Sequence, residues 1–186
     1  LNKTDRAGLT TSYNYDALKR LIGVQSPEGV VWYEYDAEGN IVKLTDAGGK
    51  ATLFEYDNDK QLIRKLYPDG SVITYKYDPA GLLKEIINSR GVSKKYIYDA
   101  NHNLLSVSYS DSTHDILFAY DEFNRIQTRN DGTGSSQFTY DADNRLTALN
   151  GPWENDAVSF TYNELGHLRY IMPQGGQPVS YSLDTV

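Results

Sequence analysis

The chain has 186 residues, a formal net charge of −7 and no cysteine. Its length allows one domain or two small ones, and its 39% hydrophobic and 23% charged residues are typical of a folded protein rather than a disordered or membrane-embedded one. The lack of cysteine excludes disulfides and thiolate metal sites. Because an acidic surface repels phosphate groups, no nucleic-acid partner is expected. The sequence contains no apolar run of about eighteen residues, so no transmembrane segment is predicted.

A Tyr-Asp pair recurs along the chain, each time followed after four further residues by Leu or Ile. The pairs are Tyr15 with Asp16, Tyr35 with Asp36, Tyr56 with Asp57, Tyr77 with Asp78, Tyr98 with Asp99, Tyr120 with Asp121, Tyr140 with Asp141, and Tyr162 with Asn163. Successive tyrosines are 20, 21, 21, 21, 22, 20 and 22 residues apart. Such regularity is typical of a repeat protein, so residues 1–186 are predicted to form one array of eight copies with partial repeats at both ends. We expect the array to be a fragment of a longer chain.

The stretch that ends in the repeated tyrosine has the pattern of a half-buried β-strand. The residue two positions before this tyrosine is aromatic in all eight repeats, and the residue between them is mostly polar, as in Tyr33-Glu34-Tyr35. Successive side chains of a strand point to opposite faces, so the two aromatic rings share one face of the predicted sheet. Aromatic enrichment also favours a strand over a helix.

The Asp after the tyrosine begins a predicted turn. Its carboxylate is expected to accept hydrogen bonds from backbone N–H groups two or three residues ahead, and the fourth residue after the tyrosine, often Gly or Asn, tolerates a positive φ. Lys19, Lys60 and His102 occupy that position less favourably. The Leu or Ile then begins a returning strand, as at residues 41–44 and 62–66. Its apolar residues are often the first and fourth, which indicates either a β-bulge or burial on both faces.

A second turn, rich in Gly, Pro and Asp, connects each returning strand to the next repeat. Its length varies, most clearly at residues 110–114 and 151–155. Each repeat is therefore a β-hairpin, and a single hairpin is too small to be stable alone. The predicted fold is all-β: consecutive antiparallel β-hairpins of about 21 residues, paired edge to edge in one curved, spiralling sheet with a ladder of aromatic rings.

The sequences of residues 35–41, Tyr-Asp-Ala-Glu-Gly-Asn-Ile, and of residues 140–146, Tyr-Asp-Ala-Asp-Asn-Arg-Leu, resemble the YD repeat of bacterial Rhs proteins. Related repeats occur in the BC component of insecticidal toxin complexes, in wall-associated polymorphic toxins and in teneurins. The resemblance covers residues 5–182. It implies that the sheet is part of a hollow shell that encapsulates or presents a C-terminal toxin or effector domain.

The same resemblance implies a structural, non-catalytic role for the chain. The implied partners are the rest of the parent Rhs chain and its C-terminal effector domain. The implied location is outside the cell, either secreted or on the bacterial cell surface.

Two other classes of function are alternatives to a shell. Rows of aromatic rings also suit a carbohydrate- or host-surface-binding module, as proposed for YD repeats. An enzyme is not expected, because a catalytic carboxylate pair is normally unique, whereas these Asp residues recur at one structural position. His102, His114 and His167 lack metal-ligand spacing, so neither a metal nor a cofactor is predicted. The stretch from Asp78 to Leu82 resembles part of the Rhs protease core, but its phase places it in an ordinary repeat.

Trp153 lies in the longest irregular loop, beside Pro152. It is predicted to pack over an open end of the sheet, with an exposed contact for a sugar or a protein as the alternative. Open strand edges invite edge-to-edge association. Self-association of the chain is therefore expected.

Overall fold

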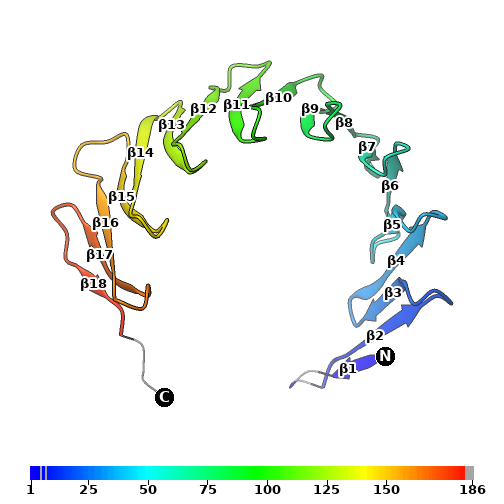
Figure 1. Cartoon of the computed structure of the whole chain (residues 1–186). Coiled ribbons are helices and arrows are strands. Elements are labelled where there is room, and N and C mark those ends of the chain that lie inside the picture. The colour runs from blue at the N-terminus through cyan, green and yellow to red at the C-terminus, as the bar shows by residue number, and fades with distance from the viewer. Residues whose placement is uncertain (5, 7, 183–186) are drawn as a thin grey trace. The chain divides into compact units, whose positions relative to one another are not determined.

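The computed structural model describes residues 1–4, 6 and 8–182, which form strands, turns and loops (Figure 1). No helix in this part of the chain is long and apolar enough to cross a membrane. The chain divides into two compact units, Leu1–Ser93 and Lys94–Val186, and each is described by itself. Both units consist of antiparallel β-hairpins, which confirms the predicted all-β fold.

The first unit contains β1 to β9, and each strand pairs antiparallel with the next one along the chain. The strands are β1 (Asn2–Thr4), β2 (Thr10–Tyr15), β3 (Leu21–Ser26), β4 (Gly29–Tyr35), β5 (Ile41–Thr45), β6 (Ala51–Tyr56), β7 (Leu62–Leu66), β8 (Val72–Tyr77) and β9 (Leu83–Ile87). β1 pairs with β2 in the way that a returning strand pairs with the first strand of the next repeat. Asp5 and Ala7, which follow β1 in the sequence, lie outside the described residues.

The second unit contains β10, apart from its first residue Ser93, and β11 to β18, again paired antiparallel in chain order. The strands are β10 (Ser93–Tyr98), β11 (Leu104–Tyr109), β12 (Ile116–Tyr120), β13 (Ile126–Asp131), β14 (Gly134–Tyr140), β15 (Leu146–Asn150), β16 (Val158–Tyr162), β17 (Leu168–Pro173) and β18 (Val179–Ser180). The last of these, β18, pairs with β17 through Val179 and Ser180. The long second turns lie between β11 and β12 and between β15 and β16, at the two places where length variation was noted.

A β-bulge is present in every Tyr-Asp hairpin. In β4 and β5, Glu34 is paired with Lys43 but the next residue, Tyr35, is paired with Ile41, so Val42 is the extra residue. The same register shift occurs immediately before the repeated tyrosine in all eight hairpins. The bulge, rather than burial on both faces, therefore explains the irregular apolar pattern of the returning strand.

The Tyr-Asp turn has the same backbone in every repeat. The Asp36 N–H donates to the Asn40 carbonyl at 3.0 Å, and the Gly39 N–H donates back to the Asp36 carbonyl at 3.3 Å. The fourth residue after the tyrosine has a positive φ in all eight turns, between 60° and 90°, including Lys19, Lys60 and His102. This is a type I turn followed by a left-handed residue, the usual three-residue hairpin connection.

Each unit is one sheet thick, so its aromatic side chains are half-buried rather than enclosed. In β4 and β6 the two aromatic residues of the repeat pattern, Tyr33 with Tyr35 and Phe54 with Tyr56, are half-buried and the residue between them is exposed, as the alternating pattern predicted. The most buried apolar side chain among the described residues is Val107, which is 5% exposed. The core is therefore the row of side chains that neighbouring hairpins share along one face.

The opposite face of the first unit carries ion pairs between residues that stand directly across a hairpin. The pairs are Glu34 with Lys43 at 2.7 Å, Glu55 with Arg64 at 2.6 Å and Lys76 with Glu85 at 2.8 Å. Exposed pairs of this kind contribute little stability individually. They favour the correct register, because a shift of one residue would set like charges or apolar groups opposite each other.

Candidate functional site: the junctions between repeats

The Asp carboxylate stabilises the turn from inside. Asp78 Oδ1 accepts hydrogen bonds from the backbone N–H groups of Ala80 and Leu82, both at 2.9 Å. The same pair of bonds, two and four residues ahead, is made by Asp16, Asp57, Asp99, Asp121, Asp141 and, with its amide oxygen, Asn163. The predicted donor two residues ahead is therefore confirmed. The predicted donor three residues ahead is wrong, because the second donor lies four residues ahead. The third residue instead donates its N–H to the main-chain carbonyl of the Asp.

Replacement of Asp78 by alanine is expected to lower the free energy of unfolding by about 2 kcal/mol, because two backbone N–H groups lose their acceptor. Asp78→Asn is the matched control and should be nearly neutral, since Asn163 makes the same two bonds with an amide oxygen. Urea denaturation followed by circular dichroism measures both variants. Equal destabilisation by Ala and Asn would show that the charge, and not the acceptor oxygen, holds the turn.

The hydroxyl of the repeated tyrosine links its own repeat to the preceding one. The Tyr56 hydroxyl donates to the main-chain carbonyl of Ile41 at 2.9 Å. Equivalent bonds join Tyr35 to Leu21, Tyr77 to Leu62, Tyr120 to Leu104, Tyr140 to Ile126 and Tyr162 to Leu146, at 2.7 to 3.0 Å. We call each such contact a YD junction: the Asp turn and the Leu or Ile of one repeat against the tyrosine of the next. For Tyr56 it comprises Asp36, Asn40, Ile41 and Tyr56.

The tyrosine hydroxyl acts where main-chain pairing between repeats has ended. β5 and β6 pair as far as Lys43 with Leu53, and the two strands then separate towards the Tyr-Asp turns. The carbonyl of Ile41, two residues beyond this last pair, accepts its hydrogen bond from Tyr56 instead. The tyrosine side chain therefore extends the contact between repeats to the strand ends beside the Tyr-Asp turns. This explains why tyrosine rather than phenylalanine recurs there.

Three junctions also contain an arginine, at the position four residues after the Asp. Arg20, Arg125 and Arg145 place their guanidinium carbons 4.7, 4.6 and 4.9 Å from the ring centroids of Tyr35, Tyr140 and Tyr162, respectively. Each also pairs through Nε with the Asp of its own turn at 2.7 to 2.8 Å. An arginine thus binds its own turn and stacks on the tyrosine of the next repeat. The sequence motif contains this arginine, but its role was missed because it depends on the neighbouring repeat.

Electrostatics at the junctions follow from these contacts. The backbone N–H and the side chain of Arg145 lower the pKa of Asp141, and hydrogen bonds from Asn40 lower the pKa of Asp36. Burial, with a smaller contribution from the charge of Asp36, raises the pKa of Tyr56. The junctions thus hold Asp in its charged form and Tyr in its neutral form at neutral pH.

The His and acidic side chains are the candidates for a metal site in the described part of the chain. The described residues contain no cluster of three His, Cys, Asp or Glu side chains arranged to hold a metal ion. His102, His114 and His167 are exposed and lie in separate turns. The predicted packing of Trp153 is wrong: its side chain is 65% exposed, in a loop held by hydrogen bonds from the Gly151 and Trp153 N–H groups to Asp156. A contact role for Trp153 stays a prediction.

The Teneurin YD-shell family matches residues 2–83 and 61–186 of the chain. The chain belongs to this family. The predicted membership of an Rhs/YD-repeat family is therefore confirmed. A comparison with curated protein sequences found no match.

Solved structures show the same fold as this YD-shell chain. A crystal structure of TcdB2-TccC3-Cdc42 matches 95% of the chain with a TM-score of 0.71 and 16% identity, and the chain covers 12% of that molecule. The Photorhabdus luminescens Tc holotoxin pore matches 91% of it with a TM-score of 0.65 and 15% identity, again covering 12% of the larger chain. A crystal structure of TcdB2-TccC3 matches 91% with a TM-score of 0.64 and 15% identity, covering 13%. The YD-shell chain thus spans only a small part of the length of each of these proteins.

Proposed function

We propose that residues 1–186 are a section of the wall of a protein shell that encloses a C-terminal toxin or effector domain. The proposal rests on the YD junctions, in which successive hairpins bind each other through tyrosine hydroxyls and arginines rather than presenting these groups to a ligand. Membership of the YD-shell family and the fold shared with TccC3-containing toxin complexes support it. A secreted or cell-surface location, and a partnership with the rest of a longer chain, belong to the same proposal.

The junctions favour a wall over a carbohydrate-binding surface. Sugar sites on aromatic rows need exposed ring faces, but the repeated tyrosines are half-buried, except Tyr15, which is 49% exposed. Three of these rings are already covered by arginines of the preceding repeat. The hydroxyls of six bind main-chain carbonyls of the preceding repeat. These groups stabilise the sheet itself.

Limited proteolysis of the full-length protein that carries this chain tests the proposal. The C-terminal domain should resist cleavage in the intact protein and become sensitive when the repeat region is opened by junction substitutions such as Tyr56→Ala with Tyr140→Ala. The isolated C-terminal domain is the reference for unprotected cleavage. Cleavage of the intact protein as rapid as that of the isolated domain would show that nothing is enclosed.

A further inference from the structure

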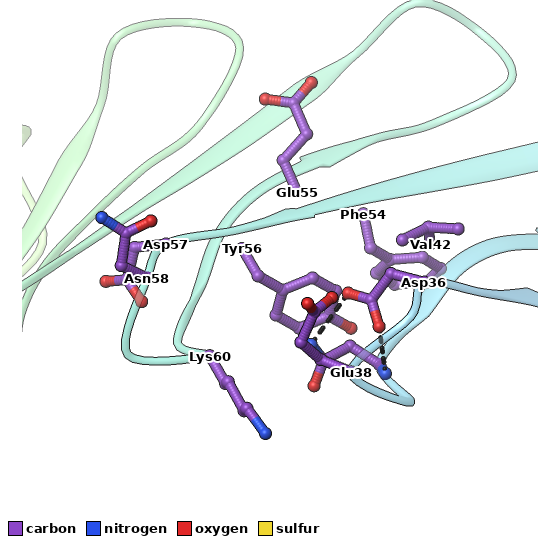
Figure 2. Close-up of a pocket in the computed structure, with 10 residues that line it drawn as sticks. Asp36, Glu38, Val42, Phe54, Glu55, Tyr56, Asp57, Asn58 and Lys60 are labelled. Atoms are coloured by element: carbon purple, nitrogen blue, oxygen red, sulfur yellow. Dashed lines mark hydrogen bonds between the residues drawn. The ribbon is translucent and has the colours of Figure 1, made fainter.

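A groove in the first unit lies at the Tyr56 junction. It has a volume of about 510 Å³ and is lined by Asp36, Glu38, Asn40, Tyr56, Asp57 and Lys60, among others. In Figure 2, Asp36, Glu38 and Tyr56 lie close together, while the Lys60 side chain projects away from them. The groove is therefore an acidic pocket with an aromatic ring in its wall.

The equivalent groove at the Tyr140 junction is partly filled by the chain itself. Its volume is about 310 Å³, and Arg125 occupies the position that corresponds to Asn40. The Arg125 guanidinium stacks on Tyr140, binds Asp121 through Nε at 2.7 Å, and donates from Nη1 to the Asp141 carbonyl at 3.1 Å. Arg20 makes the same three contacts at the Tyr35 junction, including a 3.1 Å bond to the Asp36 carbonyl. The geometry of the junction thus suits a guanidinium group.

Asn40 is too short to supply that group at the Tyr56 junction. Its Nδ2 donates to Asp36 Oδ2 at 2.9 Å, so the side chain ends at its own turn and does not extend across to Tyr56 or the Asp57 carbonyl. Among the described residues, Glu55 is paired with Arg64, whereas no ion pair includes Asp36, Glu38 or Asp57. The Tyr56 groove therefore has the tyrosine ring and the oxygen acceptors that bind arginine at the Tyr35 and Tyr140 junctions, but it contains no arginine.

We propose that the Tyr56 groove binds the guanidinium group of an arginine side chain carried by a polypeptide segment outside residues 1–186. The guanidinium would stack on Tyr56, approach the carboxylates of Asp36 and Glu38, and donate to the Asp57 carbonyl, as Arg20 and Arg125 do at their own junctions. Arginine fits better than lysine, because only the planar guanidinium stacks on a ring while it donates in fixed directions. This site goes beyond the proposed wall role and does not depend on an enclosed domain.

The test is an NMR titration of the ¹⁵N-labelled 186-residue chain with acetyl-Gly-Arg-Gly-amide, and with the lysine counterpart as the comparison. The arginine peptide should shift the amide signals of residues 36–40 and 56–60 in a saturable way, with a dissociation constant on the order of 1 mM. The lysine peptide should bind about tenfold more weakly. Added salt should weaken both interactions, because the groove is open to solvent.

Asn40→Arg is the decisive variant, since it gives the groove an internal arginine. It should abolish the response of residues 36–40 and 56–60 to the peptide and raise the melting temperature. Asn103→Arg adds the same charge at the same motif position in the other unit and should leave that response unchanged. Glu38→Gln, at an exposed turn residue, should weaken binding several-fold without affecting folding.

Three results would overturn the proposal: no saturable response at these residues, equal binding of the arginine and lysine peptides, or an undiminished response in a folded Asn40→Arg variant. If Asn40→Arg fails to fold, the lysine comparison and Glu38→Gln decide the question. Either unchanged affinity in Glu38→Gln or equal binding of the two peptides would then contradict a guanidinium site.

Discussion

Replacement of Tyr140 by alanine should lower the free energy of unfolding by about 3 kcal/mol, near the lower limit for loss of a large aromatic side chain because the ring is half-buried. The variant loses the packing of the ring, the hydrogen bond to the Ile126 carbonyl at 3.0 Å and the stacked Arg125 at 4.6 Å. Tyr140→Phe isolates the hydroxyl and should cost about 1 kcal/mol, because the Ile126 carbonyl loses its donor.

The first repeat provides the control for Tyr140. The Tyr15 side chain is 49% exposed, and its hydroxyl forms no hydrogen bond to a described residue. Tyr15→Phe should therefore change stability by less than about 0.5 kcal/mol. Urea denaturation of the four proteins gives the comparison. If Tyr140→Phe were as neutral as Tyr15→Phe, the hydroxyl bonds between repeats would not stabilise the sheet.

The second large effect expected is a loss of stability in acid. The folded chain lowers the pKa of seven Asp carboxyls below their usual value. They are Asp16, Asp36, Asp69, Asp99, Asp121, Asp131 and Asp141. A carboxyl whose pKa is lower in the folded than in the unfolded state stabilises the fold when the pH is above its pKa in the unfolded state. That contribution is lost as the pH falls through the folded pKa.

The urea midpoint should therefore be nearly constant from neutral pH to about pH 5 and should fall steeply below about pH 4. Asp141→Asn should flatten the acid limb of this profile, because one of the seven groups no longer titrates. Glu154→Gln, in an exposed loop, should leave the profile unchanged. A midpoint that stays constant or rises below pH 4 would contradict the assignment of these carboxylates to the turns.

Most of the fold was predictable because each hairpin is defined locally. The positive φ at Lys19 and Lys60 was predictable from position alone, since Gly39 and Asn144 occupy the equivalent place in other repeats. The bulge was not decided by the sequence, because an extra residue and two-sided burial give the same spacing of apolar residues.

The junctions were less predictable than the hairpins. The distance from Arg125 to Tyr140 depends on how far neighbouring repeats separate beyond their last main-chain pair, and spacing along the chain does not report this separation. The groove at Tyr56 follows from the same separation combined with the short side chain of Asn40. The exposure of Trp153 depends on the conformation of the loop that Asp156 holds through hydrogen bonds. This second turn varies in length between repeats, so the repeat pattern does not predict the conformation of the loop.

The most direct measurement compares the peptide of residues 51–66, a single hairpin from β6 to β7, with the 186-residue chain by NMR. The peptide should be unfolded and lack a bulged register at Tyr56, whereas the chain should show it, because the hairpin is held by neighbours on both sides. A peptide that folds alone with the native register would contradict the account, since the junctions would then be unnecessary for the fold.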